Sequence, residues 1–545
     1  MITVNFGLNF KINYVVATLQ GRYTSFCRKL VIGILNHLKN TMKHIGVILI
    51  LTLVSLSSKA QRIVYTQPDN NDTRSLNFEI IGKFSNSYLI YKNIRTNYYI
   101  TVYDQDLNQK DKVELKFLPD KVLNVDFISY SDYAWMIYQY QKRNIVYCNA
   151  VKINGDGKLL TDPIELDTSA ISFFAGNKIY TTISSEDKKQ VMVFKVQKKS
   201  NQFVFTTLLM DENLKLKHRS RIETNYEDKK YVFSDFLLSN AGNFVFTAGN
   251  RSSTRDYIED LDLVTKGVYD DDFTSMKINL SEKYVDDVKL KIDNLNTNYI
   301  LNSLYYLKKR GNAEGIFTAV VDEETNSLVS GTFAKIDDSL RAGIRKKGSE
   351  KTALNDFFIR NVILKKDGGF LLMAEDFYTQ SRSNNWNRWD YLYGYPSYFS
   401  PYYYYSPYYY NYYNYYGSPY GYGANDTRYY YNNILVASLD STGKYQWTAV
   451  VQKSQYDDES DNFMSYALMI TGGKLHFLFN ENLRRNLMLN GWTIDGEGDV
   501  VRNPPMHNLD RGYDFMPRYA TQVSASEIIV PCMYRNYICF AKIQF

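Results

Sequence analysis

The sequence is poor in the residues from which catalytic and metal sites are most often built. Only five of its 545 residues are histidine, and three of them, His218, His476 and His507, lie beyond residue 60. They are far apart in the chain, and none has the spacing of metal ligands. No local motif of a nucleophilic or metal-dependent enzyme stands out. The sequence therefore predicts no catalytic residue and no metal site.

Long runs of helix-forming residues are nearly absent as well. The chain instead uses 50 tyrosines and 30 phenylalanines, and Gly, Asn and Asp interrupt its apolar segments every few residues. Aromatic and β-branched residues favour strands, and the interrupting residues favour turns. We therefore expect an all-β fold.

The apolar run from Ile45 to Leu56 is too short for a transmembrane helix, which needs roughly 20 residues. A basic start and a small-residue end flank it, which is the layout of a secretory signal peptide over 42–60 with cleavage after Ala60. Residues 1–41 would then be a non-native N-terminal extension; a mitochondrial-type presequence is the alternative. No Cys follows the run, so a lipid anchor is not expected. These features predict an exported protein (periplasmic, outer-membrane-associated or extracellular) without a transmembrane segment after cleavage.

The basic charge of the chain resides in the same N-terminal segment. Residues 1–60 contain seven Lys and Arg and no acidic residue, so subtracting their +7 from the whole-chain +6 leaves −1 for the remainder. Nucleic-acid binding needs a basic patch on the folded domain. No nucleic-acid partner is therefore predicted.

Residues 61–545 repeat a unit of two β-hairpins with a period of about 50 residues, which is typical of a β-propeller. The last unit supplies only three strands, and the segment Arg62–Gln67 is a strand without a neighbour. We therefore expect the N-terminal strand to pair with the last blade and close an eight-bladed propeller. Seven blades are the alternative if the fourth unit is not separate. Stacked β-sandwiches and an outer-membrane barrel are the other folds considered. The expected units are 77–118, 123–167, 170–224, 232–293, 296–337, 361–455, 462–508 and 517–545.

The final hairpin contains two of the cysteines. A turn at Arg535-Asn536 would place Cys532 opposite Cys539 at a hydrogen-bonded pair, where side chains lie further apart than at the alternate positions. A disulfide between them is a candidate in an exported protein, and two buried free thiols are the alternative.

Two resemblances accompany the repeat. The stretches LNDFFIRNVILKKDGGFLLMAEDFY, YYYNNILVASLDSTGKYQWTAVVQKSQ and GGKLHFLFNEN resemble an uncharacterised family of exported, propeller-like proteins of Bacteroidota, which has no assigned activity to carry over. The segment LDSTGKYQW, with Asp440, Gly443 and Trp447, is similar to the blade motif of quinoprotein-type propellers. That resemblance implies that Trp447 docks between neighbouring blades. One clear copy does not indicate a quinone cofactor.

A tyrosine-rich segment interrupts the sixth unit between its two hairpins. It spans 380–431, is rich in Pro, Gly, Ser and Asn, and has few aliphatic residues, so we interpret it as an inserted low-complexity loop. Its phenol rings offer stacking and hydrogen-bonding surface for a carbohydrate or an envelope protein. The alternative is a tolerated expansion without function. The candidate binding residues are Tyr402, Tyr403, Tyr404, Tyr405, Tyr408, Tyr409, Tyr410, Tyr412, Tyr413, Tyr415 and Tyr416.

Two acidic groups, Asp270–Asp272 and Asp457–Asp461, have oxygens that could bind Ca²⁺, but solvated loop charge is the simpler interpretation, and no cofactor is predicted.

We hypothesise a non-enzymatic binding or scaffold protein of the cell envelope. The alternatives are a hydrolase or lyase with an axial pocket, and an outer-membrane-associated component.

Deletion of residues 391–425 tests the interpretation of the insertion. Because this segment cannot build an apolar core of its own, its removal is expected to leave the thermal melting temperature nearly unchanged. A large drop in that temperature would show that the segment is structural.

Overall fold

A computed structural model describes residues 62–68, 76–171, 175, 178–253, 256–309, 311–337, 340–341, 354–381, 388, 392, 427–458, 461–483, 486–504, 506, 512–535 and 537–545. The chain divides into two units at Ala60, and the described residues all belong to the second, Gln61–Phe545. The signal peptide predicted over 42–60 and the extension 1–41 lie outside the described residues. No helix among the described residues is long and apolar enough to cross a membrane.

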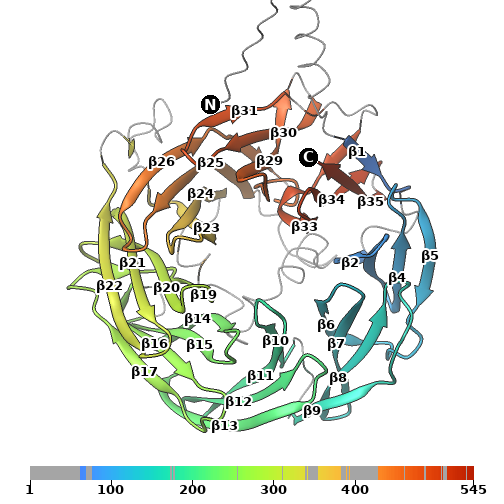
Figure 1. Ribbon diagram of the computed structural model, residues 1–545, viewed down its shortest axis with the longest axis horizontal. Helices are drawn as coiled ribbons and strands as arrows, with labels where there is room; N and C mark the ends of the chain where they lie inside the picture. Colours follow the sequence, from blue (N-terminus) through green and yellow to red (C-terminus); the bar gives the residue numbers. More distant parts are fainter. Residues whose placement is uncertain are drawn as a thin grey trace, which may run out of the picture. The chain divides into compact units, whose positions relative to one another are not determined.

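The described residues form seven hydrogen-bonded antiparallel sheets arranged as a β-propeller (Figure 1). One sheet has nine strands and contains two four-stranded meanders, which the two-residue strand β18 (Tyr284–Val285) links. Within the described part of the chain, the number of blades is therefore seven if each hydrogen-bonded sheet counts as one blade. It is eight if each meander counts as one blade.

The meanders follow the repeat expected from the sequence, and the first strands that Figure 1 labels lie towards the centre of the ring. The first three are β2–β5 (Leu76–Phe84, Ser87–Ile94, Asn97–Tyr103, Gln109–Glu114), β6–β9 (Val122–Ser129, Tyr133–Lys142, Ile145–Asn154, Ile164–Ala170) and β10–β13 (Thr181–Ser184, Gln190–Lys199, Gln202–Asp211, Leu216–Glu227). The next two are β14–β17 (Tyr231–Leu238, Phe244–Arg251, Ile258–Lys266, Thr274–Ile278) and β19–β22 (Lys289–Asp293, Asn298–Tyr306, Ala313–Asp322, Ser327–Lys335). The sixth and seventh are β23–β26 (Phe357–Leu364, Phe370–Ser381, Thr427–Leu439, Tyr445–Val451) with β27 (Gln455–Asp457), and β28–β31 (Ala467–Thr471, Lys474–Leu483, Asn486–Ile494, Val500–Arg502).

The last sheet joins the two ends of the described chain. It contains β32 (Tyr513–Phe515), β33 (Thr521–Ser524), β34 (Glu527–Tyr534) and β35 (Tyr537–Gln544), and a short 3-10 helix, η3 (Pro517–Tyr519), precedes β33. Strand β1 (Arg62–Tyr65) pairs antiparallel with β35, with Arg62 opposite Gln544. The expected pairing of the N-terminal strand with the last unit is therefore present.

The expected boundary between the fourth and fifth units is wrong. The expected fourth unit, 232–293, ends with the segment Lys289–Asp293, but β19 pairs with β20 and is the first strand of the fifth meander. The short β18 between them breaks the regular spacing, because it adds a pairing that the repeat does not contain.

Apolar clusters fill the space between successive sheets. The middle strands are buried on both faces, as in β12, whereas outer strands such as β5 are almost fully exposed. Ile80 and Tyr88 of the first sheet share a cluster with Ile529 and Phe540 of the last. Such two-sided burial explains why the strands are short and apolar on both faces instead of alternating.

The same turn recurs between the third and fourth strands of several meanders. An Asp or Asn side chain accepts hydrogen bonds from the backbone N–H groups two and four residues later, which closes the turn. The capping residues are Asp104, Asn154, Asp211, Asp440 and Asp495.

These turns also fix the contact between neighbouring sheets. Trp447 on β26 donates a hydrogen bond from Nε1 to the carbonyl oxygen of Gly496, 3.0 Å away, in the corresponding turn of the seventh meander. Gly498 in that turn has φ +92°, and a Cβ atom there would lie 2.7 Å from the Trp447 ring. Gly443 contacts Thr318 of the fifth meander in the same way. Trp447 thus docks between units, as the blade motif of Asp440, Gly443 and Trp447 implied.

The last hairpin has the predicted register, with Cys532 opposite Cys539. Both cysteines are buried free thiols with Sγ atoms 3.0 Å apart, so the structure shows the alternative to the candidate disulfide. A hydrogen-bonded pair separates the two side chains more than the adjacent pairs do.

The boundaries expected for the tyrosine-rich insertion are too wide. Strand β24 continues to Ser381 and β25 begins at Thr427, so both ends of 380–431 belong to the sheet. Leu392 is buried against Phe358 and Phe377. A deletion beginning at residue 393 therefore tests the inserted segment without removing this contact.

Replacing Trp447 with Ala tests whether the recurring turn holds neighbouring sheets together. The substitution is expected to lower the free energy of unfolding by about 2–3 kcal/mol, because it removes a half-buried ring and a hydrogen bond at once. Trp447→Phe keeps the ring contact and should cost about 1 kcal/mol. Chemical denaturation measures both. Equal stability of Trp447→Ala and the wild type would contradict the role of this contact.

Candidate functional site

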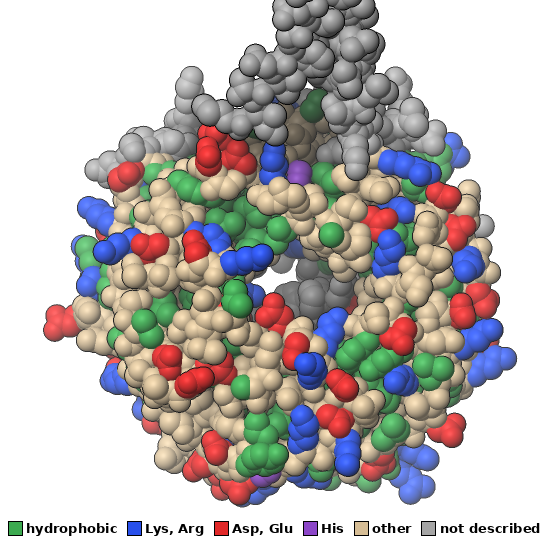
Figure 2. Space-filling view, viewed as in Figure 1, with side chains coloured by type: hydrophobic (Ala, Val, Ile, Leu, Met, Phe, Trp, Pro, Cys, Tyr) green, Lys and Arg blue, Asp and Glu red, His purple; other side chains and the backbone are tan. Residues whose placement is uncertain are grey.

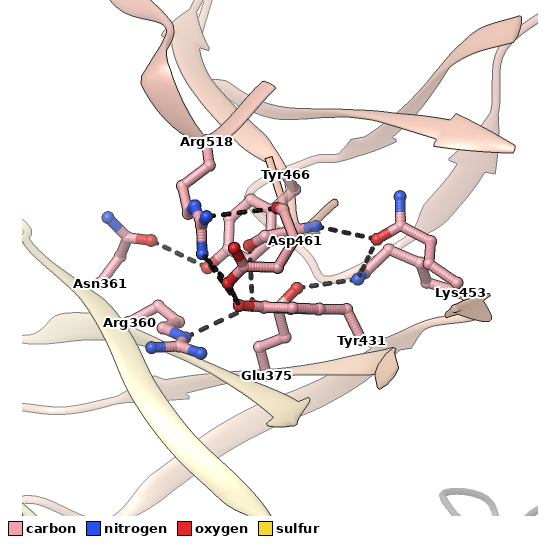
Figure 3. Close-up of polar contacts among 10 residues, drawn as sticks. Arg360, Asn361, Glu375, Tyr431, Lys453, Asp461, Tyr466 and Arg518 are labelled. Atoms are coloured by element: carbon pink, nitrogen blue, oxygen red, sulfur yellow. Dashed lines mark hydrogen bonds and ion pairs between the residues drawn. The ribbon is translucent and has the colours of Figure 1, made fainter. Parts of the chain in front are cut away.

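A fully buried carboxylate, that of Glu375 on β24, is the centre of the most extensive polar cluster of the sixth to eighth meanders. Its Oε1 lies 2.8 Å from Lys453 Nζ and its Oε2 lies 3.3 Å from Arg360 Nε. Ser465 donates a hydrogen bond to Oε2 at 2.8 Å. A buried charge needs opposite charge and hydrogen bonds, and here Lys453 and Arg360 supply the charge while Ser465 supplies the hydrogen bond to Oε2. We call the set shown in Figure 3 the Glu375 cluster: Arg360, Asn361, Glu375, Tyr431, Lys453, Gln455, Asp461, Ser465, Tyr466 and Arg518.

Lys453 is as inaccessible as its partner, since both side chains have zero accessible surface. Gln455 accepts hydrogen bonds from Lys453 Nζ and from the backbone N–H of Ser465, both at 2.9 Å. Its own amide donates to the carbonyl oxygen of Asn480, 2.8 Å away. Burial lowers the pKa of Lys453, and Glu375 opposes that shift. Lys453 therefore has a structural role and cannot contact a ligand.

A second carboxylate in the cluster, that of Asp461, holds a second arginine. Arg518 on η3 donates from Nη1 to Asp461 Oδ2 at 2.8 Å, and Tyr431 donates to the same oxygen at 2.8 Å. Burial alone would raise the pKa of Asp461, but the Arg518 guanidinium outweighs it and the pKa is lowered. The ion pair therefore stabilises the fold above the ordinary pKa of an aspartate and ceases to do so as the pH falls through the lowered pKa.

The two arginines remain partly accessible, and Arg360 differs in this from the carboxylate with which it pairs. The side chains of Arg360 and Arg518 each keep 24% of their surface accessible, while Glu375 has none. Arg360 lies on β23, the inner strand of its sheet (Figure 1). Both guanidinium groups are fixed by a carboxylate, so little side-chain freedom remains to be lost on binding. This arrangement can bind a carboxylate, sulfate or phosphate group of a ligand.

Other inner strands also carry charged side chains near the centre of the ring. Figure 2 shows a hollow there, with acidic and basic side chains beside it. Lys289 on β19 lies 3.0 Å from Asp287, with a quarter of its side chain accessible. Burial would lower the pKa of Lys289, but Asp287 and Asp235 raise it above the usual value.

The inner strand of the first meander carries a carboxyl group with a raised pKa, that of Glu79. Burial and the neighbouring Asp126 raise the pKa of Glu79 well above its usual value, and Lys178 opposes the shift. Glu79 lies on β2 and Asp126 on β6, and one oxygen of Asp126 is buried without a hydrogen-bond partner among the described residues. A carboxyl group with a raised pKa near a second carboxyl group is an arrangement that acid–base catalysis uses.

The candidate sites predicted from sequence have different outcomes. The tyrosines between Tyr402 and Tyr416 lie outside the described residues. Within the described ranges, no group of three or more His, Cys, Asp or Glu side chains could hold a metal ion. The acidic group at 457–461 is in part engaged, since Asp458 pairs with Arg428 and Asp461 with Arg518.

Sequence reasoning missed the Glu375 cluster. Its partners come from four separate elements between Arg360 and Arg518, so no spacing reveals them. One signal was present: Glu375 interrupts the apolar strand FLLMAEDF. A charged residue within an otherwise buried strand predicts a buried partner.

No family model and no protein with a curated description matches the chain. Among solved structures, it is similar to prolyl oligopeptidase B from Galerina marginata, with 8% identity and a TM-score of 0.39 over 87% of this chain and 56% of that one. A polysaccharide lyase of family PL25, an ulvan lyase, matches with 10% identity and a TM-score of 0.35 over 76% and 90% of the two chains. A Bacteroides caccae protein of unknown function matches with 12% identity and a TM-score of 0.25 over 70% and 94%. The chain spans about half the length of the prolyl peptidase chains that it matches. At these values the similarities carry no functional argument.

Replacing Lys453 with Met tests the buried ion pair. The variant leaves Glu375 with less compensation and is expected to lose about 3 kcal/mol of unfolding free energy in denaturant titration. The matched control is the double variant Glu375→Gln/Lys453→Met, which removes both charges and should recover most of that loss. If the double variant is no more stable than Lys453→Met, the pair does not act as described.

Proposed function

We propose that this chain is an exported, non-enzymatic binding protein of the cell envelope that holds an acidic group of a carbohydrate in front of Arg360 and Arg518. The observation that carries the proposal is the pair of partly accessible guanidinium groups, each fixed by a carboxylate behind it. The predicted signal peptide and the likeness to exported proteins of Bacteroidota support the location. Residues 61–545 carry a net charge of −1, so the domain as a whole does not attract anions, and an anionic ligand needs a local basic site.

Titration calorimetry with polygalacturonate, a carboxylated polysaccharide, tests this site on the full-length chain. The wild type should bind it, and Arg360→Ala and Arg518→Ala should each weaken binding about tenfold, which is the value of one charged hydrogen bond. Arg360→Lys keeps the charge beside Glu375 and should bind with intermediate affinity.

Arg219 provides the matched control. It is also paired with a buried carboxylate, that of Asp167 at 2.8 Å, but it lies on the outer strand β13. Arg219→Ala should bind polygalacturonate like the wild type. The proposal is contradicted if the wild type does not bind, or if the Arg360 and Arg518 variants, folded by their melting temperatures, bind unchanged.

A second candidate function is a hydrolase or lyase, which the Glu79 and Asp126 pair favours. In a hydrolase, Glu79 would give its proton to the leaving oxygen as the glycosidic C–O bond breaks, and Asp126 would take a proton from the attacking water. Appearance of new reducing ends or unsaturated products from polygalacturonate, abolished by Glu79→Gln, would replace the binding proposal with this one.

A further inference from the structure

The sixth meander has an ordered extension next to the tyrosine-rich insertion. Beyond a register shift near Glu375, β24 and β25 continue to pair as far as Ser381 and Thr427, and β27 adds a third strand on the other side of β25. The pairing order is β24–β25–β27. The fourth meander also has an added strand on its third strand, but β18 pairs with β16 at one residue pair, whereas β27 pairs with β25 over three.

Three tyrosines lie directly opposite one another across this extension. Tyr378 pairs with Tyr430, and Tyr430 pairs with Tyr456. The rings of Tyr378 and Tyr430 are stacked with centroids 4.5 Å apart, and those of Tyr430 and Tyr456 are 6.4 Å apart. Tyr456 is 58% exposed and the other two are half-buried. We call this row the tyrosine platform.

The opposite face of the extension is held in the core. Phe377 and Tyr431 are buried and pack with Phe358, and the partly buried Tyr429 packs against them. Side chains alternate between the two faces of a strand, so this packing leaves the tyrosine platform on the other face. A surface fixed in this way loses little freedom when a ligand binds.

Polar pairs border the tyrosine platform on both sides. Asn432 donates to Asp376 at 3.0 Å, and Arg428 Nη2 lies 3.0 Å from Asp458 Oδ2. Tyr430 donates to Gln380 Oε1 at 3.3 Å. The border contains one arginine, Arg428, and two aspartates, Asp376 and Asp458. It is therefore not basic and does not favour an acidic ligand.

We propose that the tyrosine platform binds a neutral oligosaccharide, at a site separate from Arg360 and Arg518. The apolar C–H face of a sugar ring fits against phenol rings, and its hydroxyl groups can both donate to and accept from amide and carboxylate groups at the border. Tyr378 and Tyr430 stack face to face, so the ring face offered to a sugar unit is that of the exposed Tyr456, beside the edges of the other two rings. The absence of net positive charge selects a neutral chain over a uronic or sulfated one.

Titration of the full-length chain with three neutral hexasaccharides, of β-1,4-glucose, β-1,4-mannose and β-1,3-glucose, tests the proposal. At least one should bind, and Tyr456→Ala should weaken its binding at least about tenfold, within the cost of losing one aromatic contact. Tyr456→Trp keeps an aromatic face and should bind as well as the wild type. Because Tyr456 is largely exposed, neither variant should change the melting temperature.

Tyr269, which is 75% exposed on the connection after β16, supplies the matched control. Tyr269→Ala should bind like the wild type. The proposal is overturned if none of the three hexasaccharides binds, or if Tyr456→Ala binds unchanged. Polygalacturonate binding does not decide this outcome, so failure here and failure of the guanidinium site are distinguishable.

Discussion

Each four-stranded sheet of this protein is apolar on both faces, and that constraint organises the structure. A sheet with two apolar faces must be covered on both sides, and its neighbours do so through shared clusters such as that of Ile80, Tyr88, Ile529 and Phe540. Charged side chains then lie on the outer strands, the inner strands and the turns, or in buried groups such as that of Glu375, Lys453 and Arg360. The turn capped by Asp440 and the docking of Trp447 follow from the same need, because they hold one sheet against the next.

Two buried ion clusters differ in the position of their accessible arginine, and this position distinguishes a structural cluster from a candidate binding site. Lys195 contacts Asp167, Ser169 and Tyr180 inside the sheet interface, and the accessible arginine of that group, Arg219, lies on an outer strand. In the Glu375 cluster, the corresponding cation is Arg360 on an inner strand. Both clusters satisfy a buried carboxylate. Only the second has its accessible arginine on an inner strand, near the centre of the ring, where successive sheets can contact one ligand together.

The alternation of residues and the turn residues in the sequence predicted those features of the fold that depend on neighbouring residues. The hairpin register around Cys532 and Cys539 and the pairing of the N-terminal strand both follow from strand alternation and turn chemistry. The boundary at Lys289 was misplaced because the extra strand β18 has no counterpart in the repeat. The Glu375 cluster could not be predicted, because its residues come from the sixth meander, the connection that follows it and the eighth meander, and they come together only in the folded chain. The tyrosine platform was hidden for a related reason: the insertion separates Tyr378 from Tyr430 in the sequence, although they are neighbours in the sheet.

The central claim is that a ligand binds at the inner strands of the sixth to eighth meanders. Hydrogen–deuterium exchange of the full-length chain, with and without polygalacturonate, tests it most directly, since it locates binding without altering a residue. The account predicts slower exchange in Phe357–Leu364 and in the segment from Tyr513 to Tyr519. Protection confined to outer strands such as Leu216–Glu227, or no protection anywhere, would contradict it.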